Sequence, residues 1–592
     1  MKTFSVLIDK KALISIAKKR FVNRAKRKLN KYTIMYSNKT NVNILTSILE
    51  QNCVEHIVVC PGSRNVPLVH NFNESPQFQC HPVTDERSAG FTALGIALTS
   101  PSTPVAVCVT SGSALLNLLP AVAEAAYQHL RLIIISADRP AQWIDQLDGQ
   151  TLPQHRALEP YVAKSVSLPE PTDDEGRWYC NRLVNETYIA MQRTNRPVHI
   201  NVPISEPLFD FETEELEQER IVSYVDWSDD FNKETISLYQ RKARRPMVIM
   251  GQVPPGIIPD DYTQELEEKA VVLYDQLSID EMPCYLTDQM LCAMNGKDKA
   301  LMPDFVVYFG GNTVSKRLRQ FMRRLPKGCH VVMVDAEGEL RDVGMNADFL
   351  IHGQMEQVVK DIYMTWLYDY EPASKYINAW YDLRTKVEEL HEQYSPDYSS
   401  MLAVKLFEER YGEEGGMIHY ANSMAVRLGC IYAQHYIYCN RGVNGIEGSL
   451  STAAGAALAY QDASDEKIYC VTGDLSFFYD ENALLQQQLT GNLRILLLNN
   501  HGGAIFNTLP GLAASDERDQ LVAAHHDLNA EGICRQCGLT YKQVDSLAKL
   551  YNGIDWLGTV KSDRPVVVEV MTNADDDKRA YEEYFERFKT IK

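Results

Sequence analysis

Short runs of apolar residues alternate along most of the chain with segments in which apolar residues recur at helical spacing. In the first third of the chain, three apolar runs have the length and composition of buried strands, at residues 56–60, 104–109 and 132–136. Helical spacing precedes or separates them at residues 43–51 and 86–98. This alternation predicts a doubly wound parallel sheet, in which the turns after the strands share one edge.

The same pattern returns twice further along the chain. Apolar runs of strand length recur at residues 246–251, 304–310, 330–335, 436–440, 467–472, 493–498 and 565–570. Residues 208–240 are acidic and irregular, which is typical of a linker with surface helices. We therefore predict an α/β protein with three doubly wound parallel-sheet domains. Their expected bounds are 36–207, 208–370 and 371–592, after a basic extension over residues 1–35.

Length and composition support this division and exclude several classes of protein. A chain of 592 residues is too long for one core, and a hydrophobic content of 45% suits globular packing. No run of about 18 uncharged apolar residues occurs, so we expect no membrane span. The 13 cysteines are scattered through apolar runs, which indicates a reducing cytoplasm. A net charge of −19 argues against nucleic-acid binding.

The first 34 residues differ from the rest of the chain in their charge. They contain eleven Lys or Arg residues and one Asp. A transit peptide, a membrane-surface arm, a disordered tail and an extension upstream of a start at Met35 are all compatible with this composition. We favour the last two interpretations, because the ordered pattern begins only at Asn41.

The third domain contains the segment with the most specific chemistry, a strand, turn, helix, strand and turn between residues 467 and 503. The first strand runs into Gly473 and Asp474, a helix is predicted over residues 476–489, and the second strand runs into Asn-Asn-His-Gly-Gly. Turns after neighbouring parallel strands meet at one sheet edge, so Asp474 and Asn500 could bind one divalent cation such as Mg²⁺. The alternative is an ordinary βαβ unit with an Asp N-cap and an Asn-rich turn.

This segment resembles the thiamine-diphosphate motif, in which Gly-Asp-Gly is followed, after a helix and a strand, by Asn-Asn. The third motif glycine is Leu475 here. The resemblance implies that Asp474, Asn500 and the carbonyl oxygen of Gly502 bind Mg²⁺ or Mn²⁺. In pyruvate-decarboxylase-like enzymes of this layout, a glutamate that opens a small-residue helix of the first domain contacts the aminopyrimidine of thiamine diphosphate. Glu86 matches that glutamate.

A wider set of motifs resembles a narrower family. The motifs are Pro61-Gly-Ser-Arg64, Asp85-Glu-Arg87, Thr110-Ser-Gly112, Ala137-Asp-Arg-Pro140, Asn440-Arg-Gly442, Gly445-Ile-Glu-Gly448, Gly473-Asp-Leu-Ser476 and Asn499-Asn-His-Gly-Gly503 with Ile505-Phe506. Together they resemble the 2-succinyl-5-enolpyruvyl-6-hydroxy-3-cyclohexene-1-carboxylate synthases of menaquinone biosynthesis, over about residues 40–580. That family has Gly-Asp-Leu at the metal motif, so Leu475 agrees with it, whereas Gly149 and His501 depart from its usual asparagines.

The resemblance implies a transferase that decarboxylates 2-oxoglutarate and adds the succinyl carbanion equivalent to isochorismate. Both substrates are dicarboxylates, which arginine binds through paired hydrogen bonds. Arg427 and Arg441 match positions for the part derived from 2-oxoglutarate. The positions on the isochorismate side are matched by Ser63, Arg64, Arg139, Gln150 and Lys316. Cofactor-binding positions are matched by Glu86, Ser423, Ile446, Gly473, Asp474, Leu475, Ser476, Asn500, Gly502, Ile505 and Phe506, and the last two form an apolar wall with Leu509.

Enzymes of this layout build each site from two chains, so the resemblance also implies a homodimer or a dimer of dimers. Two other classes stay open on the sequence alone. An acetolactate-synthase-like carboligase would share Glu86, Asp474 and Asn500 but would lack the arginine set and would consume pyruvate in place of 2-oxoglutarate. A binding or regulatory subunit would keep the fold but would fail to bind thiamine diphosphate.

Overall fold

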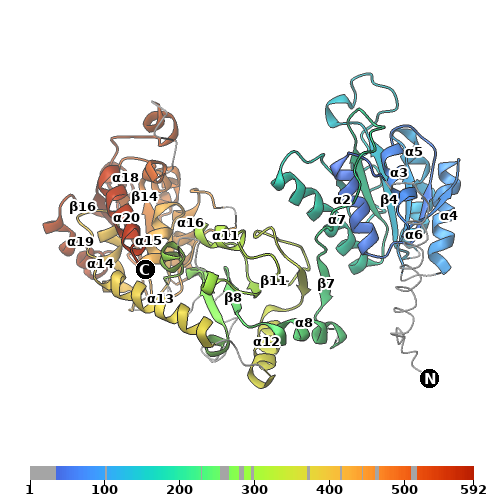
Figure 1. Cartoon of the computed structure of the whole chain (residues 1–592). Helices are drawn as coiled ribbons and strands as arrows, with labels where there is room; N and C mark the ends of the chain where they lie inside the picture. The colour runs from blue at the N-terminus through green and yellow to red at the C-terminus, as the bar shows by residue number, and fades with distance from the viewer. Residues whose placement is uncertain are drawn as a thin grey trace, which may run out of the picture. The chain divides into compact units, whose positions relative to one another are not determined.

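The computed structural model describes residues 35–591, apart from 100–102, 128, 229, 254–265, 279–285, 295–298, 370–373, 414–415, 443, 461–465, 509–511 and 513–516. The chain separates into two compact units, residues 1–224 and 225–592 (Figure 1). One sheet lies in the first unit, and two more lie between residues 223 and 571. The predicted α/β fold with three parallel sheets is therefore confirmed.

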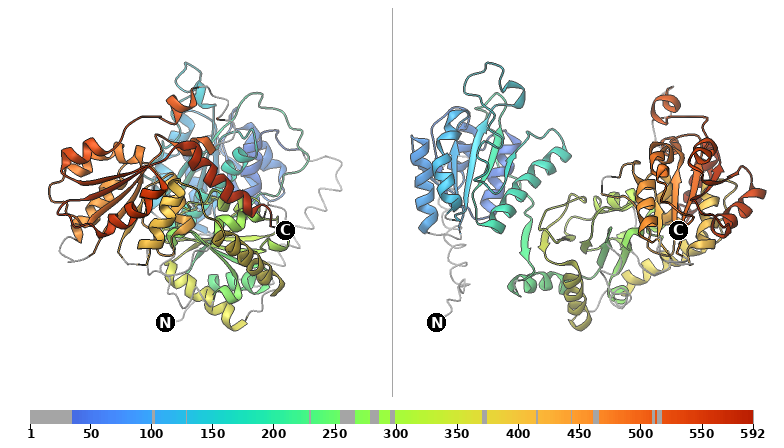
Figure 2. Two further views of the ribbon diagram at one scale, coloured as in Figure 1. Left: turned by 90° about the vertical axis from the view of Figure 1, so that its left-hand side faces the viewer. Right: turned by 180° about the vertical axis from the view of Figure 1, so that it is seen from behind.

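The first unit is built around a six-stranded sheet with the order β2-β1-β3-β4-β6-β5, in which neighbouring strands run parallel. The order reverses between β1 and β3, which is where α/β sheets bind ligands. Helices cover both faces of this sheet (Figure 2). Its elements are α2 (Thr40–Gln51), β1 (His56–Val59), α3 (Val66–Glu74), β2 (Gln79–Pro82), α4 (Glu86–Thr99), β3 (Val105–Val109), α5 (Ser113–Asn117), α6 (Leu119–Tyr127), β4 (Leu132–Asp138), β5 (Ser165–Ser167), α7 (Asp174–Thr194) and β6 (Val198–Pro203).

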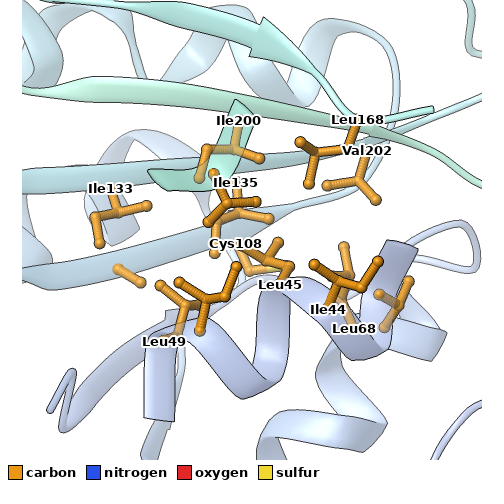
Figure 3. Close-up of a cluster of buried hydrophobic side chains, with 14 of the residues drawn as sticks. Ile44, Leu45, Leu49, Leu68, Cys108, Ile133, Ile135, Leu168, Ile200 and Val202 are labelled. Carbon is orange, nitrogen blue, oxygen red and sulfur yellow. The ribbon is translucent and has the colours of Figure 1, made fainter. Parts of the chain in front are cut away.

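Two hydrophobic clusters, one on each face, hold this sheet between its helices. Alternate residues of β3 point to opposite faces, so Ala106 and Cys108 belong to one cluster and Val105, Val107 and Val109 to the other. Because the strands are buried on both faces, they read as continuous apolar runs in the sequence. Figure 3 shows the first cluster, whose labelled residues include Ile44, Leu45, Leu49, Ile133, Ile135 and Ile200.

The second unit begins with a six-stranded sheet of order β7-β12-β11-β10-β8-β9. Its apolar core includes Val248, Val307 and Val332, which are fully buried. The elements around this sheet are β7 (Ser223–Asp226), α8 (Asp230–Lys242), β8 (Pro246–Met250), β9 (Val271–Tyr274), α10 (Thr287–Ala293), β10 (Phe305–Phe309), α11 (Lys316–Met322), β11 (His330–Asp335), β12 (Phe349–His352) and α12 (Met355–Asp369).

The third sheet has the order β13-β14-β15-β17-β16, with neighbouring strands parallel. Gly473 of β14 pairs with Leu498 of β15, so the turns that follow these strands lie side by side. The elements are α13 (Ser374–Glu392), α14 (Ser400–Tyr411), β13 (Ile418–Tyr420), α15 (Met424–Tyr432), α16 (Ser449–Ala459), β14 (Ile468–Gly473), α17 (Asp474–Tyr479), β15 (Leu493–Asn499), a 3-10 helix (Ala504–Thr508), α18 (Glu531–Cys537), β16 (Thr540–Val544), α19 (Leu547–Thr559), β17 (Val566–Met571) and α20 (Ala574–Phe588).

Two local predictions are wrong. The helix predicted over residues 476–489 ends at Tyr479, because Asp480 leaves the helical conformation and its carboxylate accepts the N–H and hydroxyl of Ser451 at 2.7 and 2.6 Å. A 3-10 helix follows at Glu481–Leu485. Residues 436–440 do not form a strand, and only Tyr438 makes an isolated bridge, since the chain turns away at Asn440.

Several other predictions are not tested by the architecture. The three domain boundaries remain predictions, because the compact units divide the chain only once. Residues 1–34 of the basic extension, and Leu509 of the apolar wall, lie outside the described residues. None of the helices in the described part of the chain has the length and apolar character needed to span a bilayer.

Candidate active site

Asp474 follows β14 and begins α17, next to the turn after β15, and its side chain is nearly fully buried. Its Oδ1 accepts the N–H of Leu475 at 2.6 Å. Its Oδ2 accepts the N–H groups of Asn500 at 3.2 Å and Gly502 at 2.9 Å. The carboxylate therefore joins the two turns at the carboxyl edge of the sheet, where the sequence predicts that they meet.

The turn after β15 presents two oxygen atoms suited to a cation, Oδ1 of Asn500 and the carbonyl oxygen of Gly502, although the latter also accepts the N–H of Ala504 at 3.0 Å. Nδ2 of Asn500 donates to Oδ2 of Asp577 at 2.7 Å, and no described residue donates to Asn500 Oδ1, so that amide oxygen is available. Gly502 has a φ of 148°, and a Cβ at this position would lie 2.8 Å from the carbonyl oxygen of Ala523. Glycine alone fits this close approach of two backbones.

The donor set fits a hard divalent cation bound together with a diphosphate. Mg²⁺ takes carboxylate, amide and carbonyl oxygens, and it completes its shell with phosphate and water. Among the described residues, no group of three or more His, Cys, Asp or Glu side chains is placed to hold a metal ion. A cation at this edge would therefore depend on the Asp474 carboxylate and on the phosphates of a ligand.

Asp577, on α20, holds Asn500 in place. Its Oδ1 accepts the N–H of Ser400 at 2.7 Å, and its Oδ2 accepts the hydroxyls of Ser400 at 2.6 Å and Thr572 at 3.2 Å. Burial raises the pKa of the Asp577 carboxyl, although these hydrogen bonds and that from Asn500 oppose the shift. Sequence reasoning missed this residue, because a run of three aspartates at a helix start indicates only helix-dipole charges.

We expect Asp577→Asn to weaken Mg²⁺ binding about 10- to 100-fold, the usual effect of removing an outer partner of a metal ligand. An amide at this position cannot accept every hydrogen bond that the carboxylate accepts, so Asn500 loses its fixed orientation. Calorimetric titration of thiamine diphosphate at a series of Mg²⁺ concentrations measures the change. Asp575→Asn, on the exposed side of the same helix, is the matched control. Equal Mg²⁺ dependence in Asp577→Asn and the wild type would contradict this role.

Glu569 supports the turn after β15 from behind. This buried carboxylate on β17 accepts hydrogen bonds from Asn499 Nδ2 at 2.8 Å, from the N–H of Ala530 at 3.1 Å and from the Tyr541 hydroxyl at 2.5 Å. Asn499 Oδ1 in turn accepts the N–H of His501 at 3.1 Å. A single charged residue in the otherwise apolar strand was the sequence signal that could have identified Glu569.

His526 is another residue near Asp474 that the sequence did not indicate. The N–H of Leu528 donates to His526 Nδ1 at 3.1 Å, so Nδ1 carries the lone pair and Nε2 the hydrogen. Nε2 lies 3.4 Å from Oδ2 of Asp474, without the geometry of a hydrogen bond. The ring also packs edge to face on Phe478, with centroids 5.3 Å apart. His526 therefore closes one side of the carboxylate.

The residues predicted to contact the organic part of the cofactor lie near the start of α17 and after the turn that follows β15. The Ser476 hydroxyl donates to the carbonyl oxygen of Ile446 at 2.5 Å, which ties the Ile446 loop to the start of α17. The side chain of Ile446 is 37% exposed. Ile505 and Phe506 follow the turn in the 3-10 helix, and a Cβ on Gly503 would lie 2.8 Å from the Phe506 ring. Apolar residues thus lie beside the start of α17 and directly after the turn that follows β15.

Ser423, Arg427 and Arg441 lie together at the start of α15. Ser423 has a φ of 72°, which is strained for a residue with a side chain. Arg427 Nη1 donates to the carbonyl oxygen of Ser423 at 2.6 Å, and Arg441 Nη1 donates to Oδ1 of Asn422 at 2.9 Å. Burial lowers the pKa of Arg441, and the charge of Arg427 lowers it further. The buried Nε of Arg441 has no hydrogen-bond partner, so this site has an unused donor.

Glu86 is in the first unit, where it begins α4. The neighbouring Asp85 accepts the N–H of Arg87 at 2.9 Å, so the helix start does not depend on Glu86. Asn117, at the end of α5, donates to Glu86 Oε2 at 3.1 Å, and no described residue donates to Oε1. One carboxylate oxygen is held and the other is available. Sequence reasoning missed the contribution of Asn117.

Arg64 and Arg139 lie side by side at the carboxyl edge of the first sheet. Arg64 Nη2 is 3.1 Å and Arg139 Nη1 is 4.0 Å from the same Oε1 of Glu206, which is mostly exposed. Arg139 Nε also pairs with Asp148 at 3.0 Å. Burial raises the pKa of Asp138, although its hydrogen bonds and the charges of both arginines oppose the shift. Arg64 is buried, whereas Arg139 is partly exposed.

The other three residues assigned to the isochorismate side are exposed. Ser63 directly precedes Arg64, at the turn after β1. Gln150 has a φ of 57°, and its carbonyl group lies 3.2 Å from where a Cβ on Gly112 would be, so it borders the turn after β3. Lys316 is the first residue of α11 in the second unit, and no described residue is its partner.

Comparison with known proteins identifies the class and then the family. Residues 39–159 match the family model for the N-terminal TPP binding domain of thiamine pyrophosphate enzymes, and residues 421–570 match the one for the C-terminal domain. The first match contains Glu86, and the second contains Asp474 and Asn500. The chain is therefore a thiamine-pyrophosphate enzyme. It belongs to the 2-succinyl-5-enolpyruvyl-6-hydroxy-3-cyclohexene-1-carboxylate synthase family, as full-length relatives show.

The relatives cover almost the whole chain. The synthase of Bacteroides fragilis is 40% identical over 577 residues, which is 94% of this chain and 100% of that protein. The synthase of Bacteroides thetaiotaomicron is 38% identical over 576 residues, again 94% of this chain and 100% of the relative. A solved benzoylformate decarboxylase from Polynucleobacter necessarius is 16% identical, covers 90% of this chain and 99% of its own, and has a TM-score of 0.41. The family assignment rests on the two synthases.

Proposed function

We propose that this chain decarboxylates 2-oxoglutarate and adds the remaining four-carbon unit to isochorismate, giving 2-succinyl-5-enolpyruvyl-6-hydroxy-3-cyclohexene-1-carboxylate and CO₂ for menaquinone biosynthesis. The observation that carries this proposal is the 40% identity to a synthase of that name along 94% of the chain. No observation favours an acetolactate-synthase-like reaction or a subunit without chemistry.

Coupled turnover tests the proposal directly. Purified protein with thiamine diphosphate and Mg²⁺ is given 2-oxoglutarate and isochorismate, and the product is identified by its mass. Pyruvate in place of 2-oxoglutarate is the control, because the alternative carboligase would consume it. Release of CO₂ from pyruvate but not from 2-oxoglutarate would overturn the proposal. A protein that failed to bind thiamine diphosphate would revive the non-catalytic class.

For the cofactor, we propose that Asp474, Asn500 and the carbonyl oxygen of Gly502 bind Mg²⁺ or Mn²⁺, with Gly473, Leu475 and Ser476 at the adjacent helix start. Thiamine diphosphate supplies, when bound, the carbon centre that attacks the keto group and accepts the electrons released with CO₂. Ile446 and Ser423 would support its rings. Glu86 would hold a proton at the aminopyrimidine, and its available oxygen supports this role.

For the substrates, we propose that fixed positive charge is the main means of recognition. Arg427 and Arg441 would bind the carboxylate that stays with the 2-oxoglutarate-derived part. The isochorismate carboxylates would bind to Arg64 and Arg139, with Ser63, Gln150 and Lys316 beside them. The Glu206 carboxylate, whose Oε1 contacts both arginines, would have to move away, because a substrate carboxylate needs the same donors.

Ile505 and Phe506 would exclude water from the reacting carbon. A strongly basic carbon centre is protonated by water if the second substrate arrives late, and this side reaction would release the four-carbon unit as an aldehyde. The position of these two apolar residues, directly after the turn that follows β15, supports this role.

We propose that the enzyme acts as a homodimer or a dimer of dimers with sites shared between chains. A mixture of Glu86→Gln and Asp474→Ala chains, each inactive alone, should regain about a quarter of the wild-type activity after random exchange, since half of the dimers are mixed and each has one intact site of two. Activity after unfolding and refolding the two variants together measures it. No recovery, despite exchange proven by differently tagged chains, would mean that each site is built within one chain.

A further inference from the structure

A third arginine lies beside Arg441. Arg319, on α11, donates from Nη1 to the carbonyl oxygen of Thr313 at 2.7 Å. Arg441 donates from Nη2 to the same oxygen at 3.3 Å. A shared acceptor places the two guanidinium groups next to each other. Arg319 comes from the segment after β10, which is far in sequence from Arg427 and Arg441.

The three guanidinium groups of Arg319, Arg427 and Arg441 have too little negative charge around them. In the described part of the chain, none of the three forms an ion pair with a carboxylate. Asp275, a buried acid whose charge acts on Arg319 and Arg441, has its oxygens engaged by the N–H groups of Leu277 at 3.2 Å and Val314 at 2.7 Å. Burial lowers the pKa of Arg319, and the charges of Arg441 and Arg427 lower it further.

Guanidinium N–H groups without a hydrogen-bond partner also favour the binding of an anion. Arg441 is 6% exposed, and its Nε has no partner. Arg319 is half-buried, and its Nε and Nη2 have no partner among the described residues. Buried, unpaired positive charge is costly unless a ligand supplies the counter-charge. Three arginines and one buried carboxylate give a net charge of +2, which a dianion would neutralise.

We propose that Arg319 is a further specificity-determining residue of the 2-oxoacid subsite, where it joins Arg441 in binding the carboxylate at the far end of a dicarboxylic acid. The inference rests on the proposed function and extends it to a residue outside the motifs that indicated that function. A monocarboxylic 2-oxoacid would leave these donors and their charge uncompensated, so the cluster selects against it.

The rival explanation is structural, because Arg319 also holds the Thr313 turn. Two substitutions separate the roles. Arg319→Gln keeps a donor for the Thr313 carbonyl oxygen but removes the charge, and Arg319→Lys keeps the charge without the planar fork. If Arg319 served only the turn, glutamine would behave as the wild type. If its charge binds substrate, lysine should be the milder change.

The experiment uses the holoenzyme with isochorismate saturating and measures kcat and KM for 2-oxoglutarate. We expect Arg319→Gln to raise that KM about 10- to 100-fold, as for a lost charge-assisted hydrogen bond, and to change kcat by less than about threefold. The inhibition constant of glutarate, a dicarboxylate that cannot react, should rise in parallel. The KM for isochorismate should stay unchanged. Arg324→Gln, exposed just after the same helix, controls for the lost charge and should match the wild type.

Two kinetic results would overturn the inference about Arg319. An unchanged KM for 2-oxoglutarate in Arg319→Gln would overturn the inference. A loss of kcat accompanied by equal rises in both KM values would overturn it too, because that result indicates a displaced turn. Failure of the wild type to consume 2-oxoglutarate is a different result: it would refute the proposed function, before any variant is compared.

Discussion

Replacing Asp474 with alanine should yield a protein that no longer retains thiamine diphosphate in the presence of Mg²⁺. Among the three proposed ligands, only Asp474 carries a full negative charge against the cation. We expect the affinity for the cofactor to fall by more than about 100-fold, since the loss of an outer partner alone costs about 10- to 100-fold. Calorimetric titration of thiamine diphosphate in Mg²⁺ measures the change.

The same substitution also removes the acceptor of three backbone N–H groups, at Leu475, Asn500 and Gly502. Leaving such groups unpaired destabilises a protein by about 1–3 kcal/mol each, so the effect on binding must be separated from the effect on the turn. Glu569→Gln is the matched control, because Glu569 supports the same turn through Asn499.

Glu569→Gln should lower the unfolding temperature without abolishing cofactor binding. If Asp474→Ala bound thiamine diphosphate as tightly as the wild type, the metal assignment would be wrong. If Glu569→Gln lost the cofactor to the same degree, a displaced turn would explain both results, and the charge on Asp474 would not be the cause.

The fold was predictable because both faces of each sheet are covered. Strands such as β4 and β15, buried along their whole length, leave continuous apolar runs that periodicity detects. The local predictions that were wrong depend on contacts between residues distant in the sequence. Nothing near Asp480 indicates that its carboxylate binds Ser451 and ends the helix at Tyr479. The three-residue strand β13 is too short to leave a pattern.

In the candidate site, too, some residues were predictable from the sequence and others were not. Asp474 and Asn500 lie at the ends of neighbouring strands, so the sequence order and the parallel sheet together bring them into contact. Asp577 and Arg319 could not be found in this manner, because Asp577 contacts Asn500 and Arg319 shares an acceptor with Arg441 only through contacts between elements distant in the sequence. Their own surroundings in the sequence are charged helix starts, which indicate solvent exposure. Only the tertiary contacts place Asp577 beside Asn500 and Arg319 beside Arg441.

Replacing Glu86 with glutamine should leave the first unit folded but nearly stop proton exchange at C2 of bound thiamine diphosphate. The glutamine amide can still accept the hydrogen bond from Asn117, and Asp85 still caps α4, so we expect a stability change within about 0.5 kcal/mol. An amide has no charge with which to hold a proton on the aminopyrimidine ring. Acid–base partners of this kind contribute about 10²- to 10⁴-fold to a rate, and exchange should slow by a factor in that range.

Exchange is measured by transferring the holoenzyme into D₂O, quenching with acid and recording the C2 proton by NMR. Asp85→Asn is the matched control, because it removes the adjacent, exposed charge while asparagine still caps the helix. It should exchange at the wild-type rate. Cofactor affinity is determined for both variants, so that slow exchange is not mistaken for lost binding. Wild-type exchange in Glu86→Gln would remove Glu86 from the mechanism, and equal slowing in Asp85→Asn would indicate a general effect of charge near the helix start.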